Sequence, residues 1–187
     1  MILGIIGPIA SGKDKVADIF EKKYGFKKIV MSDFLRVEAE REKIQVEGRY
    51  ILLRIQAELR RKYGEDYLIR LALQEIRDNK WDNVVISGLR TPIDVLEAKR
   101  RLKARIILVD AKPETRFQRQ KKRARKGFPK TLDQFIHEES IDNAALQFYK
   151  TVKMAQMKID NNGSLKEMEK RVHDLAKTKL GLKPIRK

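Results

Sequence analysis

The residues with the clearest chemical meaning lie close to the N-terminus. Residues 7–14 read Gly-Pro-Ile-Ala-Ser-Gly-Lys-Asp, which is the spacing G-x-x-x-x-G-K followed by an acid. Glycines let the backbone wrap closely around phosphates, and the N-terminus of a following helix adds the positive end of its dipole. We predict that this loop binds the phosphates of ATP through Gly7, Ala10, Ser11, Gly12, Lys13 and Asp14. Lys13 would reach the β- and γ-phosphates, whereas a chance glycine turn is the simpler alternative.

Asp14 departs from the usual form of this loop. A Ser or Thr hydroxyl normally stands there and holds Mg²⁺. A carboxylate can also hold Mg²⁺, directly or through water, although its charge repels phosphate. We therefore predict Asp14 as the metal ligand and leave open whether it binds the ion directly.

Three further side chains could act on a second, phosphate-bearing substrate. Arg36 and Arg90 each offer a planar, permanently charged fork that suits a phosphate. Asp33 could orient an attacking oxygen or hold a metal-bound water. The alternatives are a helix cap for Asp33 and weak surface ion pairs for the two arginines.

A strongly basic segment spans residues 113–130. Its cations are Arg116, Arg119, Lys121, Lys122, Arg123, Arg125, Lys126 and Lys130. The arginines at 116, 119 and 123 are spaced by three and four and so share one helical face, and Gly127 and Pro129 break the helix. Such a face could neutralise a transferring phosphoryl group and exclude water as a closing lid. A solvated basic face or a nucleic-acid patch are the alternatives.

Alternating strands and helices must position these residues. Short apolar runs at 2–6, 28–31, 83–86, 105–109 and 157–159 predict five strands. Helices are expected at 13–24, almost throughout 34–79, and at 165–180, with Ser32 and Asp33 capping the helix that begins at Phe34. Strands separated by helices indicate a parallel sheet, whose ligands bind beyond the carboxyl ends of the strands. Gly7, Asp33, Gly88, Asp110 and Asn161 fall at or just after these ends, which predicts one shared site.

The order of these motifs adds a family resemblance. The glycine loop, Ser32-Asp33-Phe34-Leu35-Arg36, a helical insertion and Ser87-Gly88-Leu89-Arg90 together resemble nucleoside monophosphate kinases and dephospho-CoA kinases. The chain is most similar to adenylate-kinase-related archaeal proteins, over nearly its whole length. The resemblance implies a single P-loop NTPase domain, 1–187, with a three-layer α/β/α fold, a helical acceptor-binding insertion at 33–79 and a lid at 116–140.

The resemblance also implies roles for individual residues. Asp33 and Arg36 would face the acceptor, Arg90 would bind its phosphate, and Asn161 would lie near the base of ATP. An ordinary Asn-Gly turn is the alternative for Asn161. Ser87 stands where the family often has an acid, which leaves the Mg²⁺ shell incomplete.

Composition narrows the class of protein further. The 187 residues include no cysteine and two histidines, which disfavours a disulfide framework, a thiol nucleophile and a histidine metal cluster. Neither a signal peptide nor a membrane-spanning stretch is evident, so we expect a cytoplasmic protein without membrane partners. The net charge of +17 favours polyanionic partners, nucleic acid among them. No feature indicates an oligomeric state.

The function expected from the sequence is transfer of the γ-phosphate of ATP, with Mg²⁺, to a nucleoside monophosphate or a similar small nucleotide. One alternative is a dephospho-CoA kinase, whose acceptor group is a hydroxyl. Another is an ATPase that docks on RNA or a ribosomal particle and uses hydrolysis as a switch, although the chain lacks a recognisable RNA module.

Overall fold

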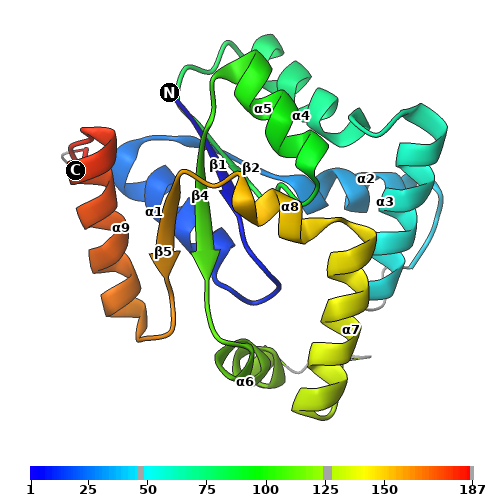
Figure 1. The fold of residues 1–187 in the computed structure, drawn as a ribbon. Coiled ribbons are helices and arrows are strands. Elements are labelled where there is room, and N and C mark those ends of the chain that lie inside the picture. The colour runs from blue at the N-terminus through cyan, green and yellow to red at the C-terminus, as the bar shows by residue number, and fades with distance from the viewer. Residues whose placement is uncertain (46–48, 124–127, 186–187) are drawn as a thin grey trace.

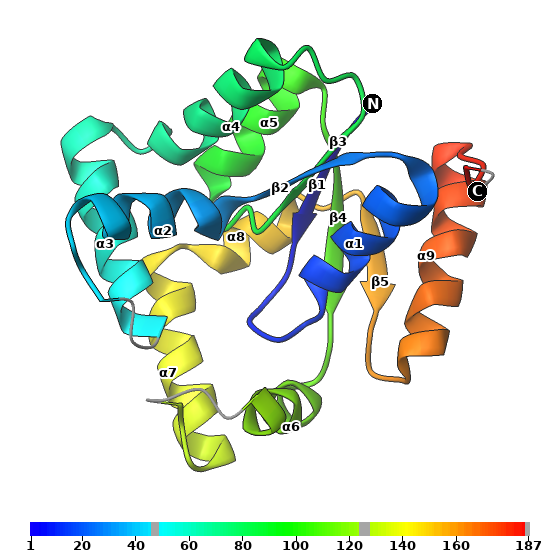
Figure 2. The same ribbon diagram turned by 180° about the vertical axis from the view of Figure 1, so that it is seen from behind.

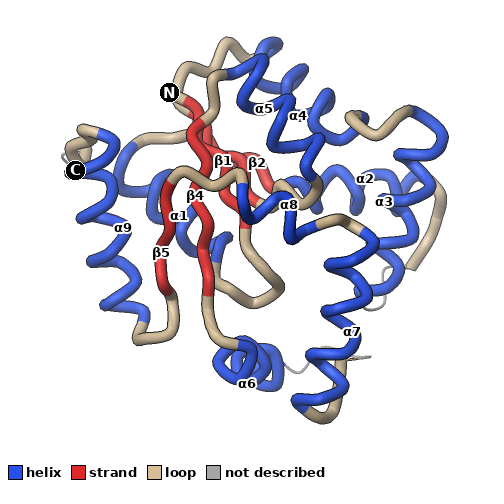
Figure 3. The backbone as a smooth tube through the Cα atoms, viewed as in Figure 1, coloured by secondary structure: helices blue, strands red, loops and turns tan. Residues whose placement is uncertain are grey.

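A parallel sheet forms the centre of the molecule. The computed structural model describes residues 1–45, 49–123 and 128–185. Its strands are β1 (Ile2–Ile6), β2 (Lys27–Val30), β3 (Val84–Ser87), β4 (Arg105–Asp110) and β5 (Met157–Asp160), in the order β2-β3-β1-β4-β5. All neighbouring pairs are parallel, and the strands lie together with helices around them (Figures 1 and 3). The predicted five-stranded parallel α/β fold is therefore confirmed.

Helices cover both faces of this sheet. Leu3 and Ile5 of β1 pack with α1 (Lys13–Tyr24) and α9 (Leu165–Leu180). Ile2 and Ile6 point the other way and pack in the core that holds α2 (Met31–Arg41), α3 (Arg49–Tyr63), α4 (Tyr67–Asp78) and α5 (Pro92–Leu102). Alternate residues of a strand face opposite sides, so one apolar strand serves two cores. Figure 2 shows α1 and α9 from the side opposite to Figure 1.

The expected helical run from Phe34 to Asn79 is divided into α2, α3 and α4. The boundary of α2 corrects our expectation about Ser32 and Asp33. The chain passes directly from β2 into α2, whose N-cap is Val30 and has no side-chain cap. Ser32 and Asp33 instead lie in the first turn, and Ser32 Oγ accepts a 2.9 Å hydrogen bond from Arg36 Nη1. The helix therefore begins at Met31, three residues before the expected start at Phe34.

The segment after β4 lies beyond the carboxyl end of the sheet. It contains α6 (Pro113–Arg123) and α7 (Leu132–Ala145), and α8 (Phe148–Lys153) then leads to β5 (Figure 1). The predicted lid residues Arg125, Lys126 and Gly127 lie outside the described residues. In the part of the chain that the structure covers, no helix has both the length and the apolar character needed to cross a bilayer.

Candidate nucleotide and acceptor site

The glycine loop passes through two left-handed backbone positions. Gly12 has a φ of 94° and precedes α1 directly, and Ala10 also adopts a positive φ of 59°. That conformation is costly for a residue with a Cβ, so surrounding structure must hold it. A Cβ on Gly7 would lie 2.3 Å from the Val109 carbonyl oxygen, and one on Gly12 would lie 2.2 Å from Asn161 Nδ2. Only glycine fits at these two positions.

Asn161 fixes the loop from the end of β5. Its buried side chain donates a 2.7 Å hydrogen bond from Nδ2 to the carbonyl oxygen of Ser11. Arg119 of α6 in turn donates from Nη2 to the carbonyl oxygen of Asn161, at 2.8 Å. The structure therefore places Asn161 against the loop backbone. Its predicted contact with the ATP base stays a prediction.

Two buried polar atoms beside the glycine loop could bind the phosphates of ATP. Within the described residues, Ser11 Oγ and Arg119 Nη1 are buried without a hydrogen-bond partner. Burial, followed by the nearby charge of Arg123, lowers the pKa of the Arg119 guanidinium. A partly desolvated cation beside a glycine loop that leads into the N-terminus of a helix is a suitable environment for an anion.

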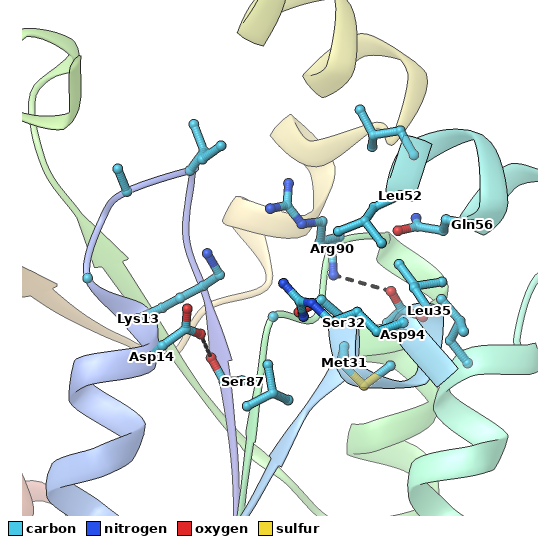
Figure 4. Close-up of a pocket in the computed structure, with 18 of the residues that line it drawn as sticks. Lys13, Asp14, Met31, Ser32, Leu35, Leu52, Gln56, Ser87, Arg90 and Asp94 are labelled. Carbon is cyan, nitrogen blue, oxygen red and sulfur yellow. Dashed lines mark hydrogen bonds between the residues drawn. The ribbon is translucent and has the colours of Figure 1, made fainter. Parts of the chain in front are cut away.

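Asp14 and Ser87 make one hydrogen-bonded pair across the site. Ser87 Oγ, at the end of β3, donates to Asp14 Oδ1 at 2.7 Å (Figure 4). The pair supplies a carboxylate and a hydroxyl beside the loop, which is the donor set that Mg²⁺ accepts together with phosphate oxygens and water. The structure shows no cluster of three or more acidic, His or Cys side chains among its described residues. Phosphate oxygens of a bound nucleotide would complete the ligand shell of an ion at this pair.

The three arginines predicted on one face of α6 have different environments. Arg116 is buried and ion-paired with Glu139 of α7, with 2.7 Å between Nη2 and Oε2. It also donates to the carbonyl oxygens of Ala111 and Ile9, so it links the loop to α7. Arg119 supports Asn161, whereas Arg123 is exposed and lines the cavity described below. The catalytic roles of these residues stay predictions, and the contacts of Arg116 point to a structural one.

Asp33 and Arg36 pair with each other at the rim. Arg36 Nη1 lies 2.9 Å from Asp33 Oδ1 on the outer part of α2. Arg36 lines the cavity and is half-exposed, while Asp33 is not one of the residues that line it. The structure therefore brings Arg36, rather than Asp33, to the site.

A cavity of about 580 Å³ joins these parts. Lys13 and Asp14 lie on one side of it, and Leu52 and Gln56 of α3 on the other (Figure 4). The guanidinium of Arg90 points into the space between them. One cavity thus runs from the phosphate loop to the helices of the insertion.

A buried network holds the backbone that carries Arg90. Asp94 Oδ2 accepts hydrogen bonds from the amides of Arg90 and Thr91, at 3.2 and 3.0 Å. Thr91 and Asp94 also form the capping box of α5. On the other side, Thr151 Oγ1 donates to the Arg90 carbonyl oxygen at 3.1 Å. These contacts preorganise Arg90 at the junction of the two halves of the cavity.

Asp94 is itself paired with Arg60 of α3. Arg60 Nη2 donates to both Asp94 oxygens, at 2.8 and 3.0 Å, and both residues are buried. Our sequence interpretation assigned no role to Gln56, Arg60 or Asp94. The sequence carried a signal for these residues. Gln56 and Arg60 are polar residues that interrupt the apolar repeat of α3, and residues 91–94 read Thr-Pro-Ile-Asp, a pattern that caps the start of a helix.

These features define a P-loop nucleotide-binding protein. A model of the AAA_17 family, described as an AAA domain, matches residues 6–137, so the chain belongs to this family. A UPF0200 protein of Pyrococcus horikoshii is 29% identical over 180 residues, covering 92% of this chain and 94% of the relative. A UPF0200 protein of Thermococcus sibiricus is 30% identical over 193 residues, covering 98% and 97%.

Solved structures share the fold as well. Shikimate kinase from Bacteroides thetaiotaomicron superposes with a TM-score of 0.61 at 18% identity, covering 95% of this chain and 96% of that one. The family match and the archaeal relatives bear out the expected membership in the P-loop, nucleoside monophosphate kinase-like group.

Proposed function

We propose that this protein transfers the γ-phosphate of ATP to a phosphate oxygen of a nucleoside monophosphate or a similar nucleotide. The observation that carries the proposal is the single cavity that has Lys13 on one wall and Arg36, Arg90 and Arg123 around the rest. Simple hydrolysis needs the phosphate loop, Mg²⁺ and a positioned water, but no binding site for a second phosphorylated ligand. Two arginines on the side of the helical insertion imply a second phosphorylated ligand.

The residues divide the work between the two substrates. Lys13 and the loop amides hold the β- and γ-phosphates, and Mg²⁺ bound with ATP near Asp14 and Ser87 would neutralise charge on the same oxygens. Arg90, with its backbone fixed by Asp94, holds the acceptor phosphate in line. An acceptor oxygen then forms a bond to the γ-phosphorus while the bond to the bridging oxygen of ADP breaks. Arg123 balances the negative charge spread over the transferring group.

The acids of the cavity favour a phosphate over a hydroxyl as the attacking group. Of the described residues lining the cavity, the acids are Asp14, Asp18 and Asp94, and none is histidine. Each acid already accepts from a neighbour: Ser87, Lys28 and Arg60 respectively, at 2.7 to 2.8 Å. A hydroxyl acceptor needs a base to remove its proton. A phosphate oxygen is already ionised near neutral pH and needs none.

An ATPase that docks on RNA is the second candidate. The net charge of +17 favours it, as does the exposed basic end of α6 at Lys121, Lys122 and Arg123. This function predicts that RNA stimulates hydrolysis of ATP and that no small acceptor competes with water. It also predicts RNA binding that weakens steeply with salt.

Phosphorus NMR of the products tests the proposal. Transfer to a phosphate oxygen makes a phosphoanhydride, whereas transfer to a hydroxyl makes a phosphate ester, and the two give distinct resonances. The acceptors should include nucleoside monophosphates, dephospho-CoA and shikimate, the ligand named with one solved neighbour. We expect an anhydride product from a monophosphate. An ester product as the main outcome would instead favour a hydroxyl acceptor.

A further inference from the structure

Exposed lysines gather at the end of the molecule where the strands begin. In a parallel sheet connected by helices, the first residues of the strands and the last turns of the helices share one end. Six exposed lysines belong to this end, and we call them the strand-start lysines: Lys22, Lys23, Lys27, Lys103, Lys179 and Lys183. Figures 1 and 2 show both chain ends here, opposite to α6 and α7. The cavity lies at the other end, beyond the carboxyl ends of the strands.

Hydrogen bonds between distant segments join these lysines into one surface. The amide of Ile185, two residues after Lys183, donates to the Lys23 carbonyl oxygen at 2.8 Å. Arg105 donates from Nη2 to the Lys179 carbonyl oxygen, also at 2.8 Å. The ends of α1 and α9 and the start of β4 are therefore neighbours.

The surface also extends along the edge of the sheet. Lys27 and Arg105 are the first residues of β2 and β4, and β3 and β1 lie between these two strands. Three steps between neighbouring strands span about 14 Å. Lys103 lies two residues before β4, at the end of α5 on the other face of the sheet. Positive charge thus covers the edge of the sheet and the helices on both of its faces.

The charge of this surface is not neutralised by neighbouring acids. None of the strand-start lysines forms an ion pair with a described side chain. Lys28, the residue after Lys27, is by contrast held by Asp18 and Glu21, at 2.8 and 3.4 Å. Exposed Asp78 and Asp82, at the end of α4, alternate with the cations Arg77 and Lys80. The positive field is therefore strongest over α1, α9 and the starts of β2 and β4.

Stabilisation of helix ends explains only some of these lysines. A cation in the last turn of a helix interacts favourably with the helix dipole, and Lys22, Lys23 and Lys179 have that position. Lys27 begins a strand, and Lys183 lies beyond the glycine that ends α9. Neither has a helix end of its own to stabilise. Their presence favours an external anion.

The side chains around the lysines indicate the kind of anion. Of the exposed large hydrophobic side chains in the described structure, Met1 and Ile185 lie at this end, and neither is aromatic. A stable protein interface has an apolar centre, and an anionic membrane surface is held by apolar or aromatic anchors as well as by cations. Single-stranded nucleic acid is bound by stacking its bases on aromatic rings. Contacts to the phosphates of a duplex need only cations and other hydrogen-bond donors.

We propose that the surface formed by the strand-start lysines binds the phosphate backbone of double-stranded nucleic acid, without reading its bases or sugars. The proposal is independent of the proposed function, because this surface and the cavity lie at opposite ends of the molecule. It also differs from the RNA-dependent ATPase, which would use the exposed end of α6. A bound duplex leaves the cavity open, so it should leave the rates of phosphotransfer and ATP hydrolysis unchanged.

Fluorescence anisotropy with the wild-type protein gives the first test. The probes are a labelled RNA duplex, a DNA duplex of equal length and mixed sequence, and polyglutamate as an acidic polypeptide. We expect both duplexes to bind within about tenfold of each other, with an affinity that falls linearly on a plot of log K against log salt. Polyglutamate should bind at least tenfold more weakly. Absence of duplex binding at low salt, or equal binding of polyglutamate, would overturn the proposal.

Two triple variants of equal charge locate the surface. Lys27→Gln/Lys179→Gln/Lys183→Gln removes three strand-start lysines, and Lys112→Gln/Lys121→Gln/Lys122→Gln removes three exposed lysines around α6. The first should weaken duplex binding by roughly tenfold or more at low salt and lower the salt slope by roughly one for each lost phosphate contact. The second should stay within threefold of wild type. Equal losses in both variants would show that affinity follows net charge alone, and a larger loss in the second would place the duplex on α6; either result overturns the proposal.

The nucleic-acid surface and the kinase fail in different measurements. Phosphotransfer without any duplex binding would retain the kinase and remove the surface. Duplex binding that is lost in the first triple variant, with no transfer to any acceptor, would retain the surface and remove the kinase. Hydrolysis of ATP that rises when the duplex is added would contradict the separation of the two.

Discussion

Ser87 donates a 2.7 Å hydrogen bond to Asp14, and this pair reverses the usual placement of the two groups. In many P-loop enzymes the hydroxyl belongs to the loop and the carboxylate to a neighbouring strand. Here the loop carries the carboxylate, and the end of β3 carries the hydroxyl. The same two chemical groups are retained, with their positions in the sequence exchanged.

The exchange predicts how two single variants and one double variant behave. Ser87→Ala should weaken metal binding in the nucleotide complex by roughly tenfold, because it removes the partner that orients Asp14. Asp14→Ser should weaken it more, since it removes the carboxylate. The double variant Asp14→Ser/Ser87→Asp should recover part of the loss by restoring the usual order. Electron paramagnetic resonance of Mn²⁺ with ATP measures this affinity directly, and additive losses in the double variant would contradict the exchange.

Lys13→Ala should lower phosphotransfer by about a hundredfold or more, because a positioned cation on developing phosphate charge contributes on that scale. Lys13 is not in either hydrophobic core, so the melting temperature should change little. Lys22→Ala, on the exposed part of the same helix, is the control for loss of one positive charge. Wild-type rates in Lys13→Ala would remove the phosphate loop from the mechanism.

Arg90→Ala should act on the acceptor and spare ATP. Losing a charge-assisted contact to phosphate should lower kcat/KM for the acceptor by about 10- to 100-fold. Arg100→Ala, which removes an exposed arginine of α5 paired with Glu97, should leave it unchanged. Steady-state kinetics at varied acceptor, with ATP binding measured separately, provide the comparison. If the variant loses affinity for ATP and keeps the wild-type KM for the acceptor, then Arg90 binds ATP rather than the acceptor.

Arg116→Met should destabilise the protein by about 3–5 kcal/mol, because it leaves Glu139 buried without its cation. The double variant Arg116→Met/Glu139→Leu should regain most of the lost free energy of unfolding, since it also removes the unpaired carboxylate of Glu139. Urea denaturation of the three proteins measures the difference. If Arg116→Met instead keeps full stability and loses only catalysis, then Arg116 is a catalytic lid residue after all.

The sequence predicted the sheet and the helix after the glycine loop well, for physical reasons. Strands buried on both faces are short apolar runs, and β1 and β4 are such runs without ambiguity. α1 begins at Lys13 and ends before Gly25, because the glycine adopts a left-handed conformation that terminates the helix.

The start of α2 and the roles of buried polar residues were not predictable in the same way. Ser32 has the residue type of a cap, yet α2 begins at Met31, directly after β2, and Ser32 lies within its first turn. The spacing of Arg116 places it on the arginine face of α6, but its partner Glu139 is 23 residues away. Arg60 and Asp94 are likewise 34 residues apart. Pairing at such separations depends on how helices pack, which local periodicity does not encode.

The central claim is most directly tested by following the label from γ-³²P-ATP with Mg²⁺ and a panel of nucleoside monophosphates. The account predicts that, for at least one of them, labelled nucleoside diphosphate forms well above the rate of labelled inorganic phosphate release. If every monophosphate yields only inorganic phosphate, and RNA accelerates that release, the kinase function is contradicted and the RNA-dependent ATPase takes its place.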